Sequence, residues 1–370
     1  MTSLYLHIPF CHKKCLYCSF VKEVWRLDKE AQFVEAICQE MSCYREKFGA
    51  VPVDTVFVGG GTPSSLRPAS LSRIFHHMHA CFEVSSQSEK TCEMNPESVT
   101  SKHLDCLKST GFNRVSMGVQ SFDAQELRTL GRNHGALHVQ KAVALLQEKG
   151  FFNFNLDIMF GLPHTTLATL ERTLVQAISL HPTHLSTYAL TIERGTPFSR
   201  NHQQKVPEDT ELAHYHFIQR FLHSNGYIHY EVSAFSKPGF QCRHNVGYWH
   251  LDPFIGLGPS GASFFQNYHY VQTKNIDQYL QDPRPVFLKK KIQGLSKSTQ
   301  IKDYVVANLR RIDGICLTHF YDRFQQSFVS LFSQQIQELV ASGHLKQTPA
   351  RISVSSKGLD ILDTILIQFC

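Results

Sequence analysis

Short apolar segments alternate with longer amphipathic segments through the first half of the chain. The apolar segments predict six strands, over residues 4–8, 55–58, 91–94, 114–118, 153–159 and 185–189. Between them, apolar side chains such as Phe33, Ile37 and Met41 recur at the spacing of one helix face. Six strand–helix units in succession predict a parallel sheet with right-handed crossovers. A closed barrel needs eight such units, so we expect an α/β fold built on a partial (β/α)6 barrel.

The pattern changes after about residue 195. A helix and an extended segment are expected up to residue 235, followed by a polar, aromatic loop through residue 270. Helical periodicity returns near residue 299, and two short strands follow near residue 350, which predicts a smaller C-terminal α+β domain, winged-helix-like. A simple helical cap is the alternative. The chain thus divides into a core domain (1–235), a connecting segment (236–294) and a C-terminal accessory domain (295–370).

Composition and charge narrow the function classes. The 370 residues are 42% hydrophobic and 18% charged, which is enough for one large and one small globular domain. The net charge of +6 is spread out, so it does not indicate nucleic-acid binding, although it would favour anionic substrates or peripheral contact with an acidic membrane. The eleven cysteines are irregularly spaced and no signal peptide precedes Cys11, which predicts reduced thiols in the cytoplasm. No apolar stretch reaches the ~18 residues of a transmembrane segment.

Three cysteines form a C-x3-C-x2-C motif just after the first strand: Cys11, Cys15 and Cys18. Three thiolates can hold three irons of a [4Fe–4S] cluster, and the fourth iron then stays open for a small molecule. The alternative is a zinc-stabilised protein without catalysis. Zinc needs four ligands, and His7 or His12 would complete the set.

The motif, with Tyr17 before its third cysteine, resembles that of radical SAM proteins. The resemblance implies that the open iron binds the amino and carboxylate groups of S-adenosylmethionine (SAM), and that an electron donor supplies the electron that cleaves it. It also implies that Gly60, Gly61 and Thr62, in the run Gly-Gly-Gly-Thr-Pro after the second strand, contact the methionine amino group.

Polar residues close the other predicted strands. Glu93 and Gln120 end the third and fourth strands, and Arg132 follows in a loop. Asp157 lies inside an apolar strand, where an unpartnered carboxylate would be costly; ribose hydroxyls or Arg132 would serve as partners. The run Gly256-x-Gly258-x-x-Gly261 matches a dinucleotide fingerprint weakly, because it opens no strand–helix unit, and we interpret it as a loop beside the same pocket.

Further motifs follow in order from residue 5 to about 263: Tyr5-Leu6-His7-Ile8-Pro9-Phe10-Cys11, Gly118-Val119-Gln120-Ser121-Phe122, Asp157-x-x-x-Gly161-Leu162-Pro163, Tyr230-Glu231-Val232-Ser233 and Gly256-Leu257-Gly258-Pro259-Ser260. With the Gly-Gly-Gly-Thr-Pro run, they resemble the coproporphyrinogen-dehydrogenase-like group of radical SAM proteins. The oxygen-independent coproporphyrinogen III dehydrogenase has a long N-terminal extension and a further cysteine two residues past the third. Here Cys11 lies near the start and Phe20 occupies that position. The chain instead carries an H-N-x-x-Y-W motif, from His244 to Trp249, and in this it is similar to the HemW haem chaperone family.

This resemblance implies a protein that binds haem and transfers it to an apo-haemoprotein recipient, with the cluster and SAM involved. His244 is implied as the haem-binding residue and Cys242 is a second candidate ligand; the alternative for His244 is a packed, hydrogen-bonded structural role. The competing function is the SAM-dependent oxidative decarboxylation of two propionates of coproporphyrinogen III, a tetrapyrrole, to give protoporphyrinogen IX, so the residues leave open whether the chain is an enzyme. The expected cofactor-binding residues besides His244 are Tyr5, Tyr17, Gly60, Gly61, Thr62, Glu93, Gln120, Arg132, Asp157, Ala189 and Ala262.

Overall fold

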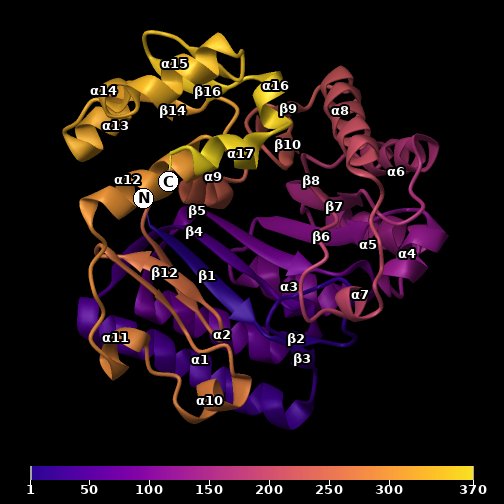
Figure 1. Ribbon diagram of the computed structural model, residues 1–370. Helices are drawn as coiled ribbons and strands as arrows, with labels where there is room; N and C mark the ends of the chain where they lie inside the picture. The colour runs from indigo at the N-terminus through magenta and orange to yellow at the C-terminus, as the bar shows by residue number, and fades with distance from the viewer. Residues whose placement is uncertain (1, 370) are drawn as a thin grey trace.

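Six parallel strands form the centre of an 11-stranded sheet in the computed structural model, which describes residues 2–369 (Figure 1). They lie side by side in sequence order, and every neighbouring pair is parallel. This confirms the predicted partial (β/α)6 barrel. The strands are β1 (Ser3–Ile8), β4 (Val51–Gly60), β5 (Phe82–Met94), β6 (Arg114–Gln120), β7 (Phe154–Phe160) and β8 (His184–Ala189).

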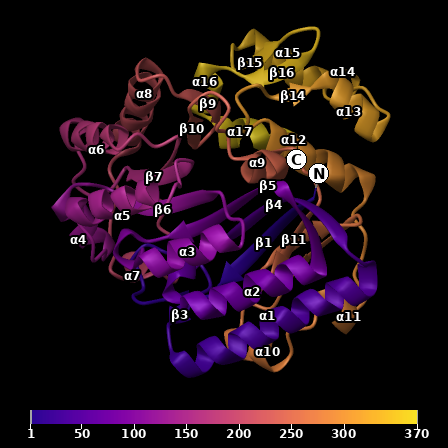
Figure 2. The same ribbon diagram turned by 180° about the vertical axis from the view of Figure 1, so that it is seen from behind.

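Helices between these strands bury their apolar faces against the sheet. Figure 2 shows α1 (Leu27–Phe48), α2 (Pro68–Cys81) and α3 (Ser101–Ser109) lying across one face. Phe33, Ile37 and Met41 on α1 are fully buried, as their spacing predicted. The remaining helices of this half are η1 (Pro63–Ser65), η2 (Pro96–Ser98), α4 (Ala124–Leu130), α5 (Ala136–Glu148), α6 (Leu167–Ser179), α7 (Pro197–Arg200) and α8 (Glu208–Ser224).

Short strands extend the sheet at both edges. On one side β10 (Ala234–Ser236) and β9 (Ile228–Glu231) follow β8. On the other side β11 (Phe254–Leu257) pairs in parallel with β1 and is followed by β12 (Ala262–Phe265) and β13 (Tyr268–Val271). The expected loop through residue 270 is therefore wrong: four-residue strands are too short to show a period of their own, and pairing with β1 stabilises them.

Three further helices and a small sheet complete this part of the chain. The helices are α9 (Arg243–Trp249), α10 (Ile276–Gln281) and α11 (Val286–Lys289), and β2 (Phe10–Cys11) pairs with β3 (Glu23–Val24). Helix α9 lies between the barrel and the C-terminal part, on the side where β1 begins (Figure 1). None of the helices among residues 2–369 is long and apolar enough to cross a bilayer.

The last part of the chain folds around its own hydrophobic core, which includes Tyr304, Phe320, Ile352 and Ile365. Its three strands pair antiparallel, with β16 in the middle, which confirms a smaller α+β part. The separate core supports the domain boundary that we propose near residue 295. The elements are α12 (Lys297–Asn308), β14 (Ile315–Cys316), α13 (Leu317–Phe324), α14 (Phe328–Leu331), α15 (Ser333–Ala341), β15 (Leu345–Gln347), β16 (Arg351–Val354), α16 (Ser356–Leu359) and α17 (Leu362–Ile367).

Candidate functional site

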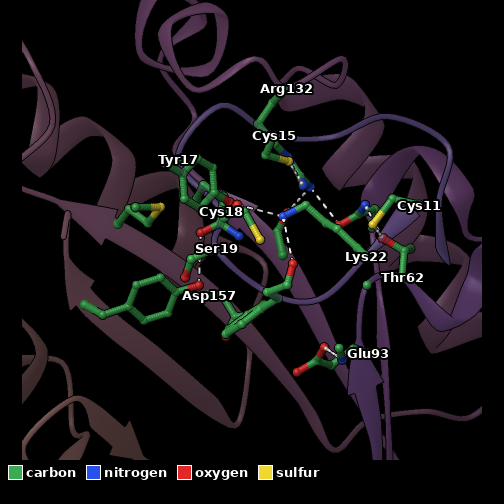
Figure 3. A pocket seen from close by; sticks show the side chains of 18 of the residues that line it. Cys11, Cys15, Tyr17, Cys18, Ser19, Lys22, Thr62, Glu93, Arg132 and Asp157 are labelled. Carbon is green, nitrogen blue, oxygen red and sulfur yellow. Dashed lines mark hydrogen bonds between the residues drawn. The ribbon is translucent and has the colours of Figure 1, made fainter. Parts of the chain in front are cut away.

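A cavity of about 370 Å³ opens at the carboxyl ends of the parallel strands. Figure 3 shows the cysteine loop, strand ends and Arg132 pointing toward one another there. Polar groups converge at this edge because all six central strands end on it. Twelve of the fifteen predicted site residues line the cavity: Cys11, Cys15, Tyr17, Cys18, Gly60, Gly61, Thr62, Glu93, Gln120, Arg132, Asp157 and Ala189.

The three cysteines line this cavity together, and the thiols of two of them accept hydrogen bonds from neighbouring side chains. Arg132 Nη1 donates to Cys15 Sγ at 3.4 Å, and Thr62 Oγ1 donates to Cys11 Sγ at 3.6 Å. Burial raises the pKa of the Cys11 thiol, while Thr62 and the charge of Lys22 act in the opposite direction. Such donors and cations stabilise thiolates, which are the form that binds iron.

The donor set fits a multi-iron cluster better than a single zinc ion. Zinc holds its sulfur ligands at about 2.3 Å, so its donors must gather tightly. Among residues 2–369, no group of three or more His, Cys, Asp and Glu side chains is arranged to hold a single metal ion. The three thiols line an open cavity, which has room for a small ligand beside them.

Asn95 is a residue of this site that the sequence did not single out. Its Oδ1 accepts from Arg132 Nη2 at 2.8 Å, and its Nδ2 donates to Thr62 Oγ1 at 3.1 Å. Asn95 thus joins the side chains that donate to Cys15 and Cys11. Its position directly after β5 would have identified it, had the strand-end argument been applied to every polar residue. The cavity is also lined by Lys13, Lys22, Gly118, Met159, Tyr188 and Glu193, among others.

The glycine run at the end of β4 has a packing reason that the sequence did not show. A Cβ at Gly61 would lie 2.5 Å from the carbonyl oxygen of Phe10, and one at Gly60, where φ is +105°, would lie 2.6 Å from the ring of His7. A Cβ at Gly59 would lie 2.7 Å from Glu93 Oε2. No other residue fits these positions without displacing its neighbours. Gly60 and Gly61 still present their backbone to the cavity.

Glu93 and Asp157 are two of the carboxylates that line the cavity. Burial and the neighbouring charge of Asp157 raise the pKa of Glu93 to about 8, against a hydrogen bond from the Gly60 N–H at 3.2 Å. Burial raises the pKa of Asp157 to about 6, against hydrogen bonds from Asn155 and Ser186. A cation that approaches either group would lower its pKa and so favour the ionised carboxylate.

Asp157 and Arg132 do not form a direct pair with each other. Asp157 Oδ1 accepts from Asn155 Nδ2 at 2.7 Å. Arg132 Nη2 instead donates to Asn95 and, at 2.6 Å, to the carbonyl oxygen of Gly118. The charge of Arg132 still lowers the pKa of Asp157 from a distance.

Gln120 has a backbone conformation that is unusual for a residue with a side chain. Its φ is +69°, and the pairing of β6 with β7 is irregular between Gly118 and Gln120. Tyr188 donates its hydroxyl to Gln120 Oε1 at 3.0 Å. Such strain persists only where neighbours hold it, and it often marks a functional site.

Three predicted residues do not line the cavity: Tyr5, Ala262 and His244. Tyr5 lies deeper in the barrel, with its hydroxyl 3.1 Å from His7 Nδ1 and its ring stacked on Phe57. Ala262 lies in β12, and its carbonyl oxygen packs against Gly256. A Cβ on Gly256 would lie 2.1 Å from this oxygen. The run from Gly256 to Gly261 therefore permits close backbone packing and does not line the cavity.

His244 is 1% exposed and lies between the rings of Phe57 and Tyr248. Thr55 donates its hydroxyl hydrogen to Ser3, so its oxygen must accept from His244 Nδ1–H at 2.8 Å. Burial lowers the pKa of His244 to about 3, and its Nε2 has no hydrogen-bond partner. The ring is therefore neutral with a free lone pair on Nε2, as iron ligation requires, but it is closed off from solvent.

Cys242, the other candidate ligand, is fully buried. Burial raises the pKa of its thiol to about 12. It is therefore a protonated thiol in this conformation, which ligates iron poorly.

Comparisons with known proteins agree with this architecture. The description "Radical SAM superfamily" matches residues 5–177, and "HemN C-terminal domain" matches residues 295–361. The solved structure of coproporphyrinogen III oxidase (HemN) from Escherichia coli superposes with a TM-score of 0.85 at 24% identity, over 100% of this chain and 89% of that one, which shows the shared fold.

Two relatives are similar in sequence. "Heme chaperone HemW" from Lactococcus lactis is 30% identical over 99% of this chain and 97% of the relative. "Heme chaperone HemW" from Escherichia coli is 37% identical over 69% of this chain and 68% of the relative. With the cysteine motif, the cavity and the H-N-x-x-Y-W helix in place, this chain belongs to the HemW family of radical SAM proteins.

Proposed function

We propose that this chain is a haem chaperone, which binds haem and transfers it to an apo-haemoprotein. The observation that carries the proposal is its similarity to the HemW protein of Lactococcus lactis, 30% identity over 99% of the chain. The position of the further cysteine of the dehydrogenase is occupied by Phe20, which lines the cavity and is 65% exposed. A phenyl ring cannot replace a thiol as a ligand or as a redox group.

Cys11, Cys15 and Cys18 would hold a [4Fe–4S] cluster, and SAM would occupy the adjoining space. When both are bound, the cluster supplies an electron to SAM. The residues of this chain would bind SAM and orient it. Glu93 and Asp157 offer oxygen acceptors to an ammonium or to ribose hydroxyls. Arg132 offers a fixed charge and a fork of donors that suits a carboxylate.

His244 is the proposed axial ligand of haem. Its neutral ring and unpartnered Nε2 support this role. Its burial means that α9 must move away from Phe57 before iron can approach. Haem ligation by His244 therefore requires a local opening of α9.

The cellular setting follows from the same proposal. We place the chain in the cytoplasm, where its free cysteines stay reduced. An electron donor and a haemoprotein recipient are its partners. The mild positive charge would support contact with an acidic membrane surface rather than with nucleic acid.

The test is a haem titration of the reconstituted protein, followed by its visible absorbance. We expect His244→Ala to weaken haem binding at least about tenfold, since losing an axial bond costs more than 1.4 kcal/mol, and to leave the cluster absorbance unchanged. The matched control is His214→Ala, because His214 on α8 is also fully buried and lacks hydrogen-bond partners on both nitrogens. Equal haem affinity in wild type and His244→Ala would remove His244 from the site.

A second assay distinguishes the chaperone from the dehydrogenase alternative. That alternative is tested because this chain shares its fold with HemN. The reconstituted protein is incubated anaerobically with SAM, a reductant and coproporphyrinogen III, and the products are separated by chromatography. We expect no protoporphyrinogen above background. Its formation would replace the chaperone assignment with an enzymatic one.

A further inference from the structure

A continuous chain of hydrogen bonds crosses the barrel interior from the cavity to the start of α9. Asp157 Oδ1 is 2.7 Å from Asn155 Nδ2, and Asn155 Oδ1 is 2.7 Å from His184 Nδ1. His184 Nε2 is 2.7 Å from the hydroxyl of Tyr230, which is 3.3 Å from the backbone nitrogen of Cys242. Cys242 is the residue that immediately precedes α9.

The links of this chain are buried. Asn155 is 1% exposed, His184 and Cys242 are fully buried, and Tyr230 is 8% exposed. Hydrogen bonds in such a medium are stronger than in water, and each polarises the next. Removing any one of these side chains would leave a buried donor or acceptor without a hydrogen-bond partner, which is costly.

Each donor in this chain is determined by chemistry. The ionised Asp157 carboxylate only accepts, so Asn155 turns its amide nitrogen to it and its oxygen to His184. His184 therefore carries its hydrogen on Nδ1. Burial lowers the pKa of His184 well below its ordinary value, so the ring is neutral and Nε2 accepts from the Tyr230 hydroxyl. The Tyr230 oxygen then accepts from the Cys242 N–H, and every donor points toward Asp157.

The barrel also holds the first turn of α9 through a second group. Glu89 on β5 accepts from the backbone N–H of Arg243 at 3.1 Å and of His244 at 3.0 Å. No side chain at the start of α9 caps it. Tyr230 and Glu89 thus replace the missing cap, and both lie near the fully buried guanidinium of Arg114.

We propose that His184 and Tyr230 are positioning residues that couple the SAM site to α9. A ligand that contacts Asp157 restrains its carboxylate, and the chain then holds α9 closed over His244. Because coupling between two sites is reciprocal, haem ligation that opens α9 disfavours SAM to the same extent. The haem part of this inference rests on the proposed function, and the coupling of Asp157 to α9 does not.

Hydrogen–deuterium exchange of the cluster-reconstituted protein, with and without SAM, tests the coupling. We expect SAM to slow exchange of the amides of residues 242–249 at least about fivefold, the lower end of typical coupling between sites. The Tyr230→Phe variant keeps the ring but breaks the chain, so its SAM response in this segment should disappear. Unchanged exchange in the wild type, or an equal response in Tyr230→Phe, would overturn the proposal.

The matched control is Tyr279→Phe. Tyr279 is fully buried and donates its hydroxyl to Glu40 at 2.8 Å, outside this chain. The Tyr279→Phe variant should lose about as much stability as Tyr230→Phe but keep the SAM response of residues 242–249. If Tyr230→Phe does not fold, Asn155→Ala gives the second test, because Asn155 bonds both Asp157, at 2.7 Å, and His184, at 2.7 Å. A full SAM response in Asn155→Ala would then count against the coupling.

The exchange measurement needs no haem, so its failure is distinct from a failure of the chaperone assignment. With haem added, SAM should weaken haem binding to wild type at least about fivefold and leave the affinity of Tyr230→Phe unchanged. Protein that shows the SAM-dependent exchange but binds no haem would retain the coupling and lose the proposed function. SAM that strengthens haem binding would overturn the sign of the coupling.

Discussion

Glu93 and Asp157 share one cavity wall, and each is held there by neutral donors rather than by a cation. Gly60 donates to Glu93, and Asn155 donates to Asp157. Neutral donors compensate only part of the cost of burying a charge, so the pKa of both carboxyl groups is raised. A cationic ligand would supply the missing compensation.

The raised pKa of Glu93 predicts a dependence of stability on pH. It is about 8 in the folded protein against an ordinary value of 4.5, so the folded state binds this proton more tightly. The resulting stability is complete below about pH 4.5 and is lost as the pH rises to about 8. We expect Glu93→Gln to flatten this decline by a few kcal/mol at most, measured by urea unfolding of the cluster-free protein. A pH profile that stays as steep as that of the wild type would contradict this; Glu35→Gln, exposed on α1, is the control.

At the scale of elements, the turn between β4 and η1 shows how closely three segments meet at the cavity edge. The Gly61 N–H donates to the carbonyl oxygen of Ile8 at 2.7 Å, and the Thr62 N–H donates to that of Phe10 at 2.7 Å. These bonds attach the turn to the end of β1 and to β2, which also carries Cys11. The glycines therefore set the position of the first cysteine relative to the strands.

Gly61→Ala should consequently disturb the cysteine loop as well as stability. Its Cβ would lie 2.5 Å from the carbonyl oxygen of Phe10, which is backbone and cannot move aside without moving β2. We expect a loss of about 2–4 kcal/mol in thermal unfolding, in the range of strained or overpacked sites, and less bound iron after reconstitution. Gly135→Ala is the control, because a Cβ there has no neighbour within 4 Å. Equal iron content and stability in the two variants would refute this account.

At the scale of the whole molecule, the C-terminal part is attached to the barrel next to α9. Arg323 on α13 donates to the carbonyl oxygens of His250 at 3.2 Å and Leu251 at 2.9 Å, directly after α9 ends. Leu251 also packs against the C-terminal core. Helix α9 is therefore held by the barrel at its start and by the C-terminal part at its end.

Arg323→Ala should loosen this attachment. It leaves two carbonyl groups without their donor, which costs about 1–3 kcal/mol. We expect proteolytic cleavage between residues 290 and 296 to become about tenfold faster, as a loss of 1.4 kcal/mol implies. Arg310→Ala is the control, since its partner Asp363 is 85% exposed and such surface pairs contribute little. Identical cleavage rates in wild type and Arg323→Ala would show that the attachment lies elsewhere.

The sequence by itself determined the parallel core and most of the cavity. Strand order follows from alternating segments, and parallel strands bring their carboxyl ends to one edge, so Cys11, Glu93 and Asp157 had to meet there. Asn95 was missed because only some of the polar residues at that edge were considered. The sequence identified the H-N-x-x-Y-W motif but did not indicate which side chains pack around it.

The tertiary structure alone decided which partner each of these groups has. Asp157 is bonded to Asn155, β11 pairs with β1, and His244 is closed in by Phe57. The last two contacts join residues far apart along the chain, and no local period encodes such pairings. The first depends on side-chain orientation inside the barrel, where burial requires every polar group to find a donor or an acceptor. That requirement acts only once the barrel has formed, and so it could not be read from the order of the residues.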